Sequence, residues 1–402
     1  MIGPISPGEG ENIQRYHEKD SEQQSEQLGE MNSEQLCEKP PDIPPPRPWA
    51  DSDWVPPLLS SRSCSSLPTS VSWSPDGSLL AVTSEDARIT VYSPGLEPTT
   101  AALDHGVVLR ETEYIYDTAW CQATGRLAAT GRYQPVHLWS LGGQGEQPGI
   151  AATYKCINQL DELSHAYSVT VSEDGLELYC GLKGEVRRFD IQRPGRESDT
   201  HLLAAGGQGG IVSCLDLNPT VPVYAAGCYN RSTGLYSRDS GQLLCLLTGQ
   251  RGGVTQVTFS KDGTRLYTGA RRDGEIVCWD LREPGKVLFT LQREVSTNQR
   301  VQFSLSPCGG LLVSANTDGS VRLWDVLARP DPDSGVLPLA TAWLLHGDAV
   351  TGAAWRPGAG RGVLATCSGQ RHFPCREGGQ SEDSEEERQQ EEEKSVRLWS
   401  LV

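Results

Sequence analysis

The chain has 402 residues, a formal net charge of −17 and 37% hydrophobic residues. It has no run of about 18 apolar residues and no basic-then-apolar N-terminal signal pattern, so we expect a soluble intracellular protein and exclude a membrane-spanning one. Two stretches, residues 1–48 and 376–394, each carry a net charge of −6, so the rest of the chain is only weakly acidic.

The chain begins with a low-complexity segment, residues 1–48, rich in Gln, Glu and Ser and poor in aromatic residues. Such a composition cannot bury enough apolar surface to offset the entropy lost on ordering. We therefore predict a disordered acidic tail.

A short strand that ends on an aromatic residue recurs seven times after the tail. These aromatic positions are 47, 50, 47, 43, 45 and 75 residues apart, and a period of about 40–45 is typical of WD-repeat propeller blades. An alternating strand with a turn and a strand of small residues precede each aromatic strand. The sequence therefore predicts an all-β, seven-bladed WD-repeat propeller over residues 49–402. The aromatic residues are Tyr92, Trp139, Phe189, Tyr236, Trp279, Trp324 and Trp399.

Blade seven needs an outer strand, because the printed chain ends at Val402, directly after its aromatic strand. Residues 49–59 (WADSDWVPPLL) precede blade one and are the predicted donor. Pairing the two ends of the propeller in one blade would remove an open sheet edge, which is otherwise an aggregation hazard.

The spacing of 75 residues before the last aromatic strand indicates an insertion in blade seven. Residues 376–394 form the predicted insert, an acidic disordered loop between the last two strands. Ser384 precedes three glutamates and is a candidate for acid-directed phosphorylation. A purely solubilising acidic run is the alternative interpretation.

The twelve cysteines are scattered through predicted strands, and no pair has C-x-x-C spacing. Buried reduced thiols act as small apolar residues, so we expect them to be core residues. The nearest candidate for a zinc site combines Cys367, His372 and Cys375, but it lacks a fourth ligand. We expect no metal and no cofactor.

Function on a propeller is expected in the loops, because the strands are scaffold. The turns between second and third strands share one face with the links between blades. Blades one to three give this face many acidic residues, whereas blades four to seven give it arginines and amides. Arginines among amides and aromatic residues suit single-stranded RNA, whose bases stack on planar groups. The predicted RNA-binding residues are Asn230, Arg231, Arg271, Arg272, Arg293, Asn298, Gln299, Arg300, Gln370, Arg371 and Phe373.

Specific roles follow from residue chemistry. Phosphate contacts are predicted for the arginines at 271, 272, 293 and 300, and the first two could also contact bases. Asn298 and Gln299 suit contacts with base edges. Arg371, beside Phe373, suits stacking on a base. The alternative is that these arginines bridge blades to acidic turn residues such as Asp273. Catalytic motifs such as G-x-S-x-G or a P-loop are absent from the sequence, so we expect no enzymatic activity.

Several strings in these loops resemble the telomerase Cajal body protein family. The resemblance covers roughly residues 49–373 and the acidic insert that follows. Its strings are YIYDTAW (114–120), NQLDEL (158–163), GARRDGEIVCWDLR (269–282), REVSTNQR (293–300) and ATCSGQRHFP (365–374).

The resemblance implies a non-enzymatic, RNA-binding scaffold in the nucleus, in Cajal bodies and at telomeres, with some cytoplasmic protein. The implied ligands are the Cajal-body box of H/ACA small Cajal-body RNAs and telomerase RNA. The implied partners are the dyskerin-containing H/ACA particle, telomerase and, for folding, the cytosolic chaperonin. A protein-interaction adaptor, for example in DNA double-strand-break repair, is the alternative.

Overall fold

The computed structural model describes residues 54–95, 102–103, 106–142, 146–358, 362–370 and 393–401. The predicted tail (1–48), Ser384 and the predicted insert up to residue 392 lie outside these residues. The described residues belong to one compact unit, Arg47–Val402.

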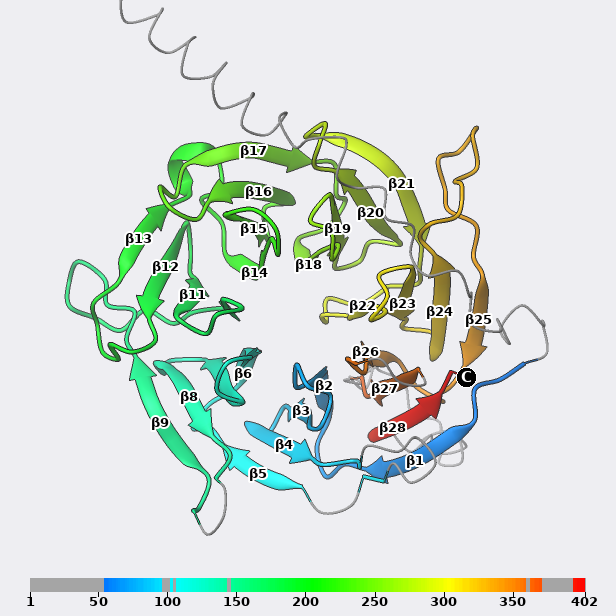
Figure 1. The fold of residues 1–402 in the computed structure, drawn as a ribbon, viewed down its shortest axis with the longest axis horizontal. Coiled ribbons are helices and arrows are strands. Elements are labelled where there is room, and N and C mark those ends of the chain that lie inside the picture. The colour runs from blue at the N-terminus through cyan, green and yellow to red at the C-terminus, as the bar shows by residue number, and fades with distance from the viewer. Residues whose placement is uncertain are drawn as a thin grey trace, which may run out of the picture. The chain divides into compact units, whose positions relative to one another are not determined.

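Twenty-eight strands in the described part of the chain form seven antiparallel sheets of four strands each. The sheets surround a common centre, with one strand of each sheet innermost: β2 (Pro68–Trp73), β6 (Ile115–Cys121), β10 (Ser168–Val171), β14 (Val212–Leu217), β18 (Val254–Phe259), β22 (Phe303–Leu305) and β26 (Val350–Trp355) (Figure 1). This architecture is a seven-bladed β-propeller, which confirms the fold predicted from the repeats.

Blades one to three follow the chain order. Blade one contains β2 (Pro68–Trp73), β3 (Leu80–Ser84), β4 (Arg88–Tyr92) and β5 (Val107–Arg110). Blade two contains β6 (Ile115–Cys121), β7 (Arg126–Gly131), β8 (Val136–Ser140) and β9 (Gly149–Tyr154). Blade three contains β10 (Ser168–Val171), β11 (Glu177–Gly181), β12 (Glu185–Asp190) and β13 (Asp199–Leu202), followed by the short 3-10 helix η3 (Ala204–Gly206).

Blades four to six repeat the same order. Blade four contains β14 (Val212–Leu217), β15 (Val223–Cys228), β16 (Ser232–Ser237) and β17 (Leu243–Thr248). Blade five contains β18 (Val254–Phe259), β19 (Arg265–Ala270), β20 (Glu275–Asp280) and β21 (Lys286–Gln292). Blade six contains β22 (Phe303–Leu305), β23 (Leu311–Ala315), β24 (Ser320–Asp325) and β25 (Thr341–Leu344).

Blade seven is assembled from both ends of the propeller. Its inner strands are β26 (Val350–Trp355), β27 (Val363–Ser368) and β28 (Ser395–Ser400), and its outer strand is β1 (Leu58–Ser63). Figure 1 shows β1, in blue, beside β28, in red.

Residues 49–53 of the predicted donor segment 49–59 lie outside the described residues, and in the described part the outer strand of blade seven begins at Leu58. Pro56 and Pro57 have no backbone N–H group to donate to a ladder, which explains why regular pairing begins only at Leu58. Trp54 still contributes, because its carbonyl accepts a 2.9 Å hydrogen bond from Trp343 Nε1 and its ring packs edge-on against that of Trp343.

The hydrophobic core lies between the blades. Seven clusters of buried apolar side chains each combine residues of two neighbouring blades. Val71 of blade one and Val396 of blade seven, for example, belong to one cluster. Each blade is therefore stabilised mainly by its neighbours, as in other repeat architectures.

The turn after the first strand repeats a Ser-x-Asp-Gly motif in three blades. Ser74, Ser172 and Ser260 donate 2.5 Å hydrogen bonds to the aspartates two positions later. The following glycines, at 77, 175 and 263, have φ values of 71°, 71° and 69°, which glycine adopts most readily. These turns fix one end of the propeller as scaffold. Within the described ranges, the structure contains no helix with the length and apolarity that crossing a membrane requires.

Candidate functional site

A cavity of about 600 Å³ opens at the end of the strands opposite these turns. Here the turns between second and third strands meet the links between blades; we call this end the cavity face. It contains the turns 85–87, 132–135, 182–184, 229–231, 271–274 and 316–319 and the links 111–114, 155–167 and 293–302. The cavity is lined by Thr69, Ser70, Thr83, Glu85, Tyr114, Ile115, Tyr116, Asp117, Tyr167, Ser213, Tyr229, Thr255, Arg272, Ser296, Thr297, Asn298, Gln299, Arg300, Thr351 and Gln370.

One link supplies much of the polar lining. Residues 296–300 connect blades five and six, and all five of them line the cavity. The Arg272 backbone N–H donates a 3.2 Å bond to the Thr297 carbonyl, and the Ser296 N–H donates to Thr317 Oγ1. These bonds hold Asn298, which is exposed, and Gln299, which is half-buried, at the cavity mouth.

Arg300 forms an ion pair across the cavity. Its Nη1 lies 2.6 Å from Oδ1 of Asp117, at the start of β6, and the other carboxylate oxygen accepts a 3.1 Å bond from the Val169 N–H. Burial opposes the charge of the guanidinium, but the surrounding interactions, led by the carboxylate of Asp117, together outweigh burial and raise the pKa of Arg300. Arg300 is therefore committed to Asp117, although 27% of its side chain remains exposed.

Arg271 and Arg272 take different positions in the turn after β19. Arg271 is half-buried and its guanidinium carbon lies 4.4 Å from the centre of the Tyr229 ring, a cation–π contact. Arg272 is exposed and lines the cavity. Both guanidinium groups lie on the cavity face, as predicted.

Arg293 is a correction to the predicted interface. Only 3% of the residue is exposed, and its Nη atoms donate to the carbonyls of Val301 and Ala270 at 3.1 and 2.9 Å. Burial lowers the pKa of its guanidinium to about 10. Arg293 braces the backbone between blades five and six, so it is not available for phosphate.

The remaining predicted residues divide into three groups. Asn230 is exposed, but its amide is engaged within the protein: it donates to the carbonyl of Gly207, in the link between blades three and four, at 3.1 Å and accepts from Ser232 Oγ at 2.6 Å. Arg231 is exposed beside it, and Gln370 lines the cavity. Arg371 and Phe373 lie outside the described residues.

An aromatic cluster on the cavity face was not among the predicted RNA-binding residues. Its rings come from blade two and from the links on either side of it, and they lie 5.0 to 6.2 Å apart in successive pairs. Tyr133, at its edge, is 66% exposed and carries the Arg132 guanidinium 5.0 Å from its ring centre. The spacing of two between Tyr114 and Tyr116, and between His165 and Tyr167, was the available signal. The cluster contains Tyr114, Tyr116, Tyr133, His165 and Tyr167.

Three large side chains on the cavity face stand at strained backbone positions. Tyr133, Arg231 and Arg272 have φ values of 54°, 69° and 49°, whereas the left-handed positions in the corresponding turns are held by glycines in blades three and six and by Ala87 in blade one. A left-handed conformation costs a residue with a side chain roughly 1–2 kcal/mol. Such strain concentrates at functional sites. The chain thus keeps an aromatic ring and two guanidinium groups where glycine would fold more easily.

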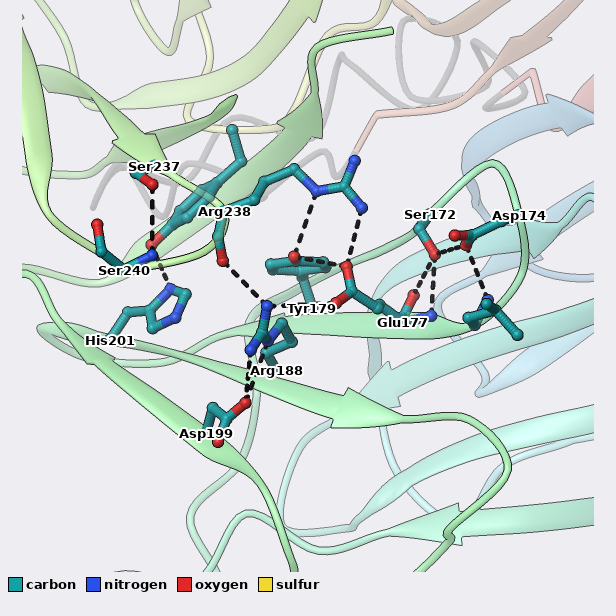
Figure 2. Close-up of polar contacts among 12 residues, drawn as sticks. Ser172, Asp174, Glu177, Tyr179, Arg188, Asp199, His201, Ser237, Arg238 and Ser240 are labelled. Carbon is teal, nitrogen blue, oxygen red and sulfur yellow. Dashed lines mark hydrogen bonds and ion pairs between the residues drawn. The ribbon is translucent and has the colours of Figure 1, made fainter. Parts of the chain in front are cut away.

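Arginines at the opposite end of the strands are used differently (Figure 2). Arg188 pairs with Asp199 at 2.7 Å, and Arg238 of blade four pairs with Glu177 of blade three at 2.8 Å. Tyr179 donates a further bond to Glu177. This network connects two blades, and its charged groups pair with one another. These arginines therefore have a structural role, in contrast to the exposed arginines of the cavity face.

Seven of the ten cysteines in the described residues are buried core residues, whereas Cys64 and Cys245 are half-buried and Cys308 is exposed. Burial raises the pKa of Cys214, Cys278 and Cys367 to about 12, so these thiols remain protonated. His372 and Cys375 lie outside the described residues. Within the described ranges, no three His, Cys, Asp or Glu side chains are grouped to hold a metal ion.

Comparison with known proteins identifies the repeats and a set of relatives. The WD domain, G-beta repeat family matches residues 59–93, 241–280 and 285–325. Telomerase Cajal body protein 1 of Mesocricetus auratus is 40% identical over 318 residues, and that of Homo sapiens is 39% identical over 323. The Drosophila melanogaster homolog is 31% identical over 326 residues.

These alignments each cover 75% of the chain but only 58%, 57% and 56% of the three relatives. The chain thus spans less than two thirds of the length of these relatives. A guanine nucleotide-binding protein negative regulator of Schizosaccharomyces pombe is 26% identical over 280 residues, or 63% of the chain and 69% of that protein.

Proposed function

Since this chain is a WD-repeat propeller related in sequence to the telomerase Cajal body proteins, we propose that it is a non-enzymatic scaffold that binds RNA directly through its cavity face. The observation that carries the proposal is the retention of Tyr133, Arg231 and Arg272 at positive φ on that face. These side chains face solvent rather than the core, because Tyr133 is 66% exposed and both arginines are exposed.

The chemistry of the face suits single-stranded RNA. Exposed aromatic rings such as Tyr133 offer stacking platforms, and the amides of Asn298 and Gln299 can pair with base edges. The guanidinium groups of Arg231 and Arg272 are exposed and can approach phosphates. Stacking, edge readout and phosphate contact are thus available within one surface.

The names of the relatives support a proposal for the class of RNA. Their name refers to telomerase and to the Cajal body. We accordingly propose that the ligand is the Cajal-body box in the terminal loop of H/ACA small Cajal-body RNAs and of telomerase RNA. Binding would retain these particles, with dyskerin, in nuclear Cajal bodies and support telomerase trafficking to telomeres; the cytosolic chaperonin would assist folding of the propeller.

A protein-interaction adaptor, for example in DNA double-strand-break repair, is the second candidate. One loop of the cavity face favours it: the Asn158 side chain accepts hydrogen bonds from the N–H groups of Leu160 and Glu162, both at 2.9 Å. The ordered loop presents Leu160, which is 77% exposed, beside acidic side chains. An apolar tip with acidic flanks would suit a basic protein partner.

Binding of the purified chain to an H/ACA hairpin distinguishes the two candidates. The hairpin is prepared with an intact or a scrambled Cajal-body box, and affinity is measured at two salt concentrations. Direct recognition predicts box-dependent binding that falls steeply with salt, because each neutralised phosphate releases counterions. Equal affinity for both hairpins, or none for either, would favour the adaptor.

A further inference from the structure

The size of the cavity sets the class of ligand it can take. Its volume of about 600 Å³ lies within the range of roughly 300–1,000 Å³ that small-molecule pockets occupy. The space therefore exceeds what a single amino acid side chain needs and is large enough to admit a planar group of nucleobase size.

The charges in the cavity balance. Two carboxylates, Glu85 and Asp117, and two guanidinium groups, Arg272 and Arg300, line it, and Asp117 and Arg300 are paired at 2.6 Å. A phosphate would lose its hydration there without gaining a net positive partner, which is unfavourable. An uncharged polar group avoids that cost, so the lining favours a base over a phosphate.

The walls of the cavity carry aromatic rings. Tyr116 and Tyr167 both line it, with ring centres 5.2 Å apart. Tyr229 lines another part of the wall, and the guanidinium group of Arg271 lies over its ring. Aromatic and guanidinium planes are the surfaces on which nucleobases stack.

Some polar atoms of the cavity lining have hydrogen-bond partners within the described part of the chain, and others do not. The hydroxyls of Ser213 and Thr351 donate to carbonyls of the neighbouring blades, Val254 and Pro68. By contrast, Thr297 Oγ1 and the Nε of Arg300 are buried polar atoms with no hydrogen-bond partner in the described protein. Buried polar groups are normally paired, so two unpaired ones beside one cavity indicate a place for a polar ligand.

Together these features lead us to propose that the cavity takes one unpaired nucleobase extruded from the bound RNA. This inference rests on the RNA-binding function proposed above and specifies its recognition element. The base stacks against the tyrosine wall, its polar edge meets the 296–300 link and Arg300, and its phosphates remain outside, near Arg231 and Arg272.

The test uses the full chain and a series of H/ACA hairpins, each with one loop nucleotide made abasic. Removing the inserted base should weaken binding about 5- to 150-fold, as expected for a lost stacked base. Abasic changes elsewhere in the loop should cost less.

Two protein variants assign that loss to the cavity. Tyr116→Leu removes part of the stacking wall, and Gln299→Trp fills the cavity mouth; both should bind the intact hairpin more weakly and lose most of the abasic penalty. Tyr133→Ala, on the same face but outside the lining, should weaken binding and keep the penalty. Arg238→Ala, at the opposite end of the strands, should keep both affinity and penalty. Circular dichroism and melting curves verify that each variant is folded.

The outcomes are separable. If the wild-type chain binds the hairpin but no abasic position stands out, or the penalty survives in both cavity variants, the nucleobase pocket is wrong and RNA binding stands. If the wild-type chain binds no hairpin, both proposals fail. The inference is also wrong if the chain binds free nucleosides but removing a base from the RNA loop does not weaken RNA binding at any position.

Discussion

Arg300 and Asp117 form a 2.6 Å ion pair, although 183 positions separate them in the chain. Asp117 begins the inner strand of blade two, and Arg300 lies in the link between blades five and six. The pair therefore joins opposite parts of the ring across the cavity and positions the polar 296–300 link.

Replacing Arg300 by methionine should destabilise the propeller. The change leaves the carboxylate of Asp117, only 10% exposed, without its cation. Removing one partner of a buried ion pair costs about 3–5 kcal/mol of stability. Because Arg300 is partly exposed, we expect the free energy of unfolding to fall by about 2–3 kcal/mol. The melting temperature reports this loss. Arg251→Met is the matched control, because Arg251 is 76% exposed and pairs weakly with Glu275; an equal effect in both variants would contradict the structural role of Arg300.

Arg293→Met should lower stability without a specific loss of RNA affinity. The substitution leaves the carbonyls of Val301 and Ala270 without their donors, and each unsatisfied buried group costs about 1–3 kcal/mol. Calorimetry should show the lower melting temperature. Hairpin affinity of the folded fraction should match that of the wild type; a selective loss of affinity at unchanged stability would return Arg293 to the interface.

Glycine at two strained positions should separate folding from binding. Tyr133→Gly and Arg231→Gly relieve a positive φ but also make the unfolded chain more flexible, so stability should stay within about 1 kcal/mol of wild type. Loss of a stacking ring should weaken hairpin binding by about 1–3 kcal/mol. Melting curves and binding isotherms on the same samples test this combination. Retained affinity in both variants would remove the main support for the proposed interface.

The fold was predictable because each blade is a local unit with its own aromatic strand and turn. Two parts of the site were not. Arg293 and Arg271 have the same chemistry in the sequence, and only the path of the backbone decides that the first meets carbonyls and the second meets the Tyr229 ring. The aromatic cluster likewise combines Tyr133 with His165, which lie in separate loops.

Acid should weaken blade seven through Glu393. Burial of this carboxyl opposes its charge, but hydrogen bonds from His346, Ser395 and the Gly347 N–H outweigh burial and lower its pKa from 4.5 to about 2. A lowered pKa in the folded state contributes stability above pH 4.5, which is lost as the pH falls toward 2. Melting temperatures from pH 7 to pH 3 should fall less steeply for Glu393→Gln, although that variant starts from a lower value. If the melting temperatures of the wild type and Glu393→Gln fall equally steeply with pH, Glu393 is not the group that makes blade seven sensitive to acid.

Contact between the cavity face and RNA can be tested by comparing arginines at the two ends of the strands. Hairpin affinity is measured for wild type, Arg271→Ala and Arg238→Ala, with melting temperatures for all three. We expect Arg271→Ala to weaken binding by about 1–3 kcal/mol while the protein stays folded, and Arg238→Ala to lower the melting temperature but keep the affinity. Equal affinities for all three proteins, or a loss only in Arg238→Ala, would contradict this contact.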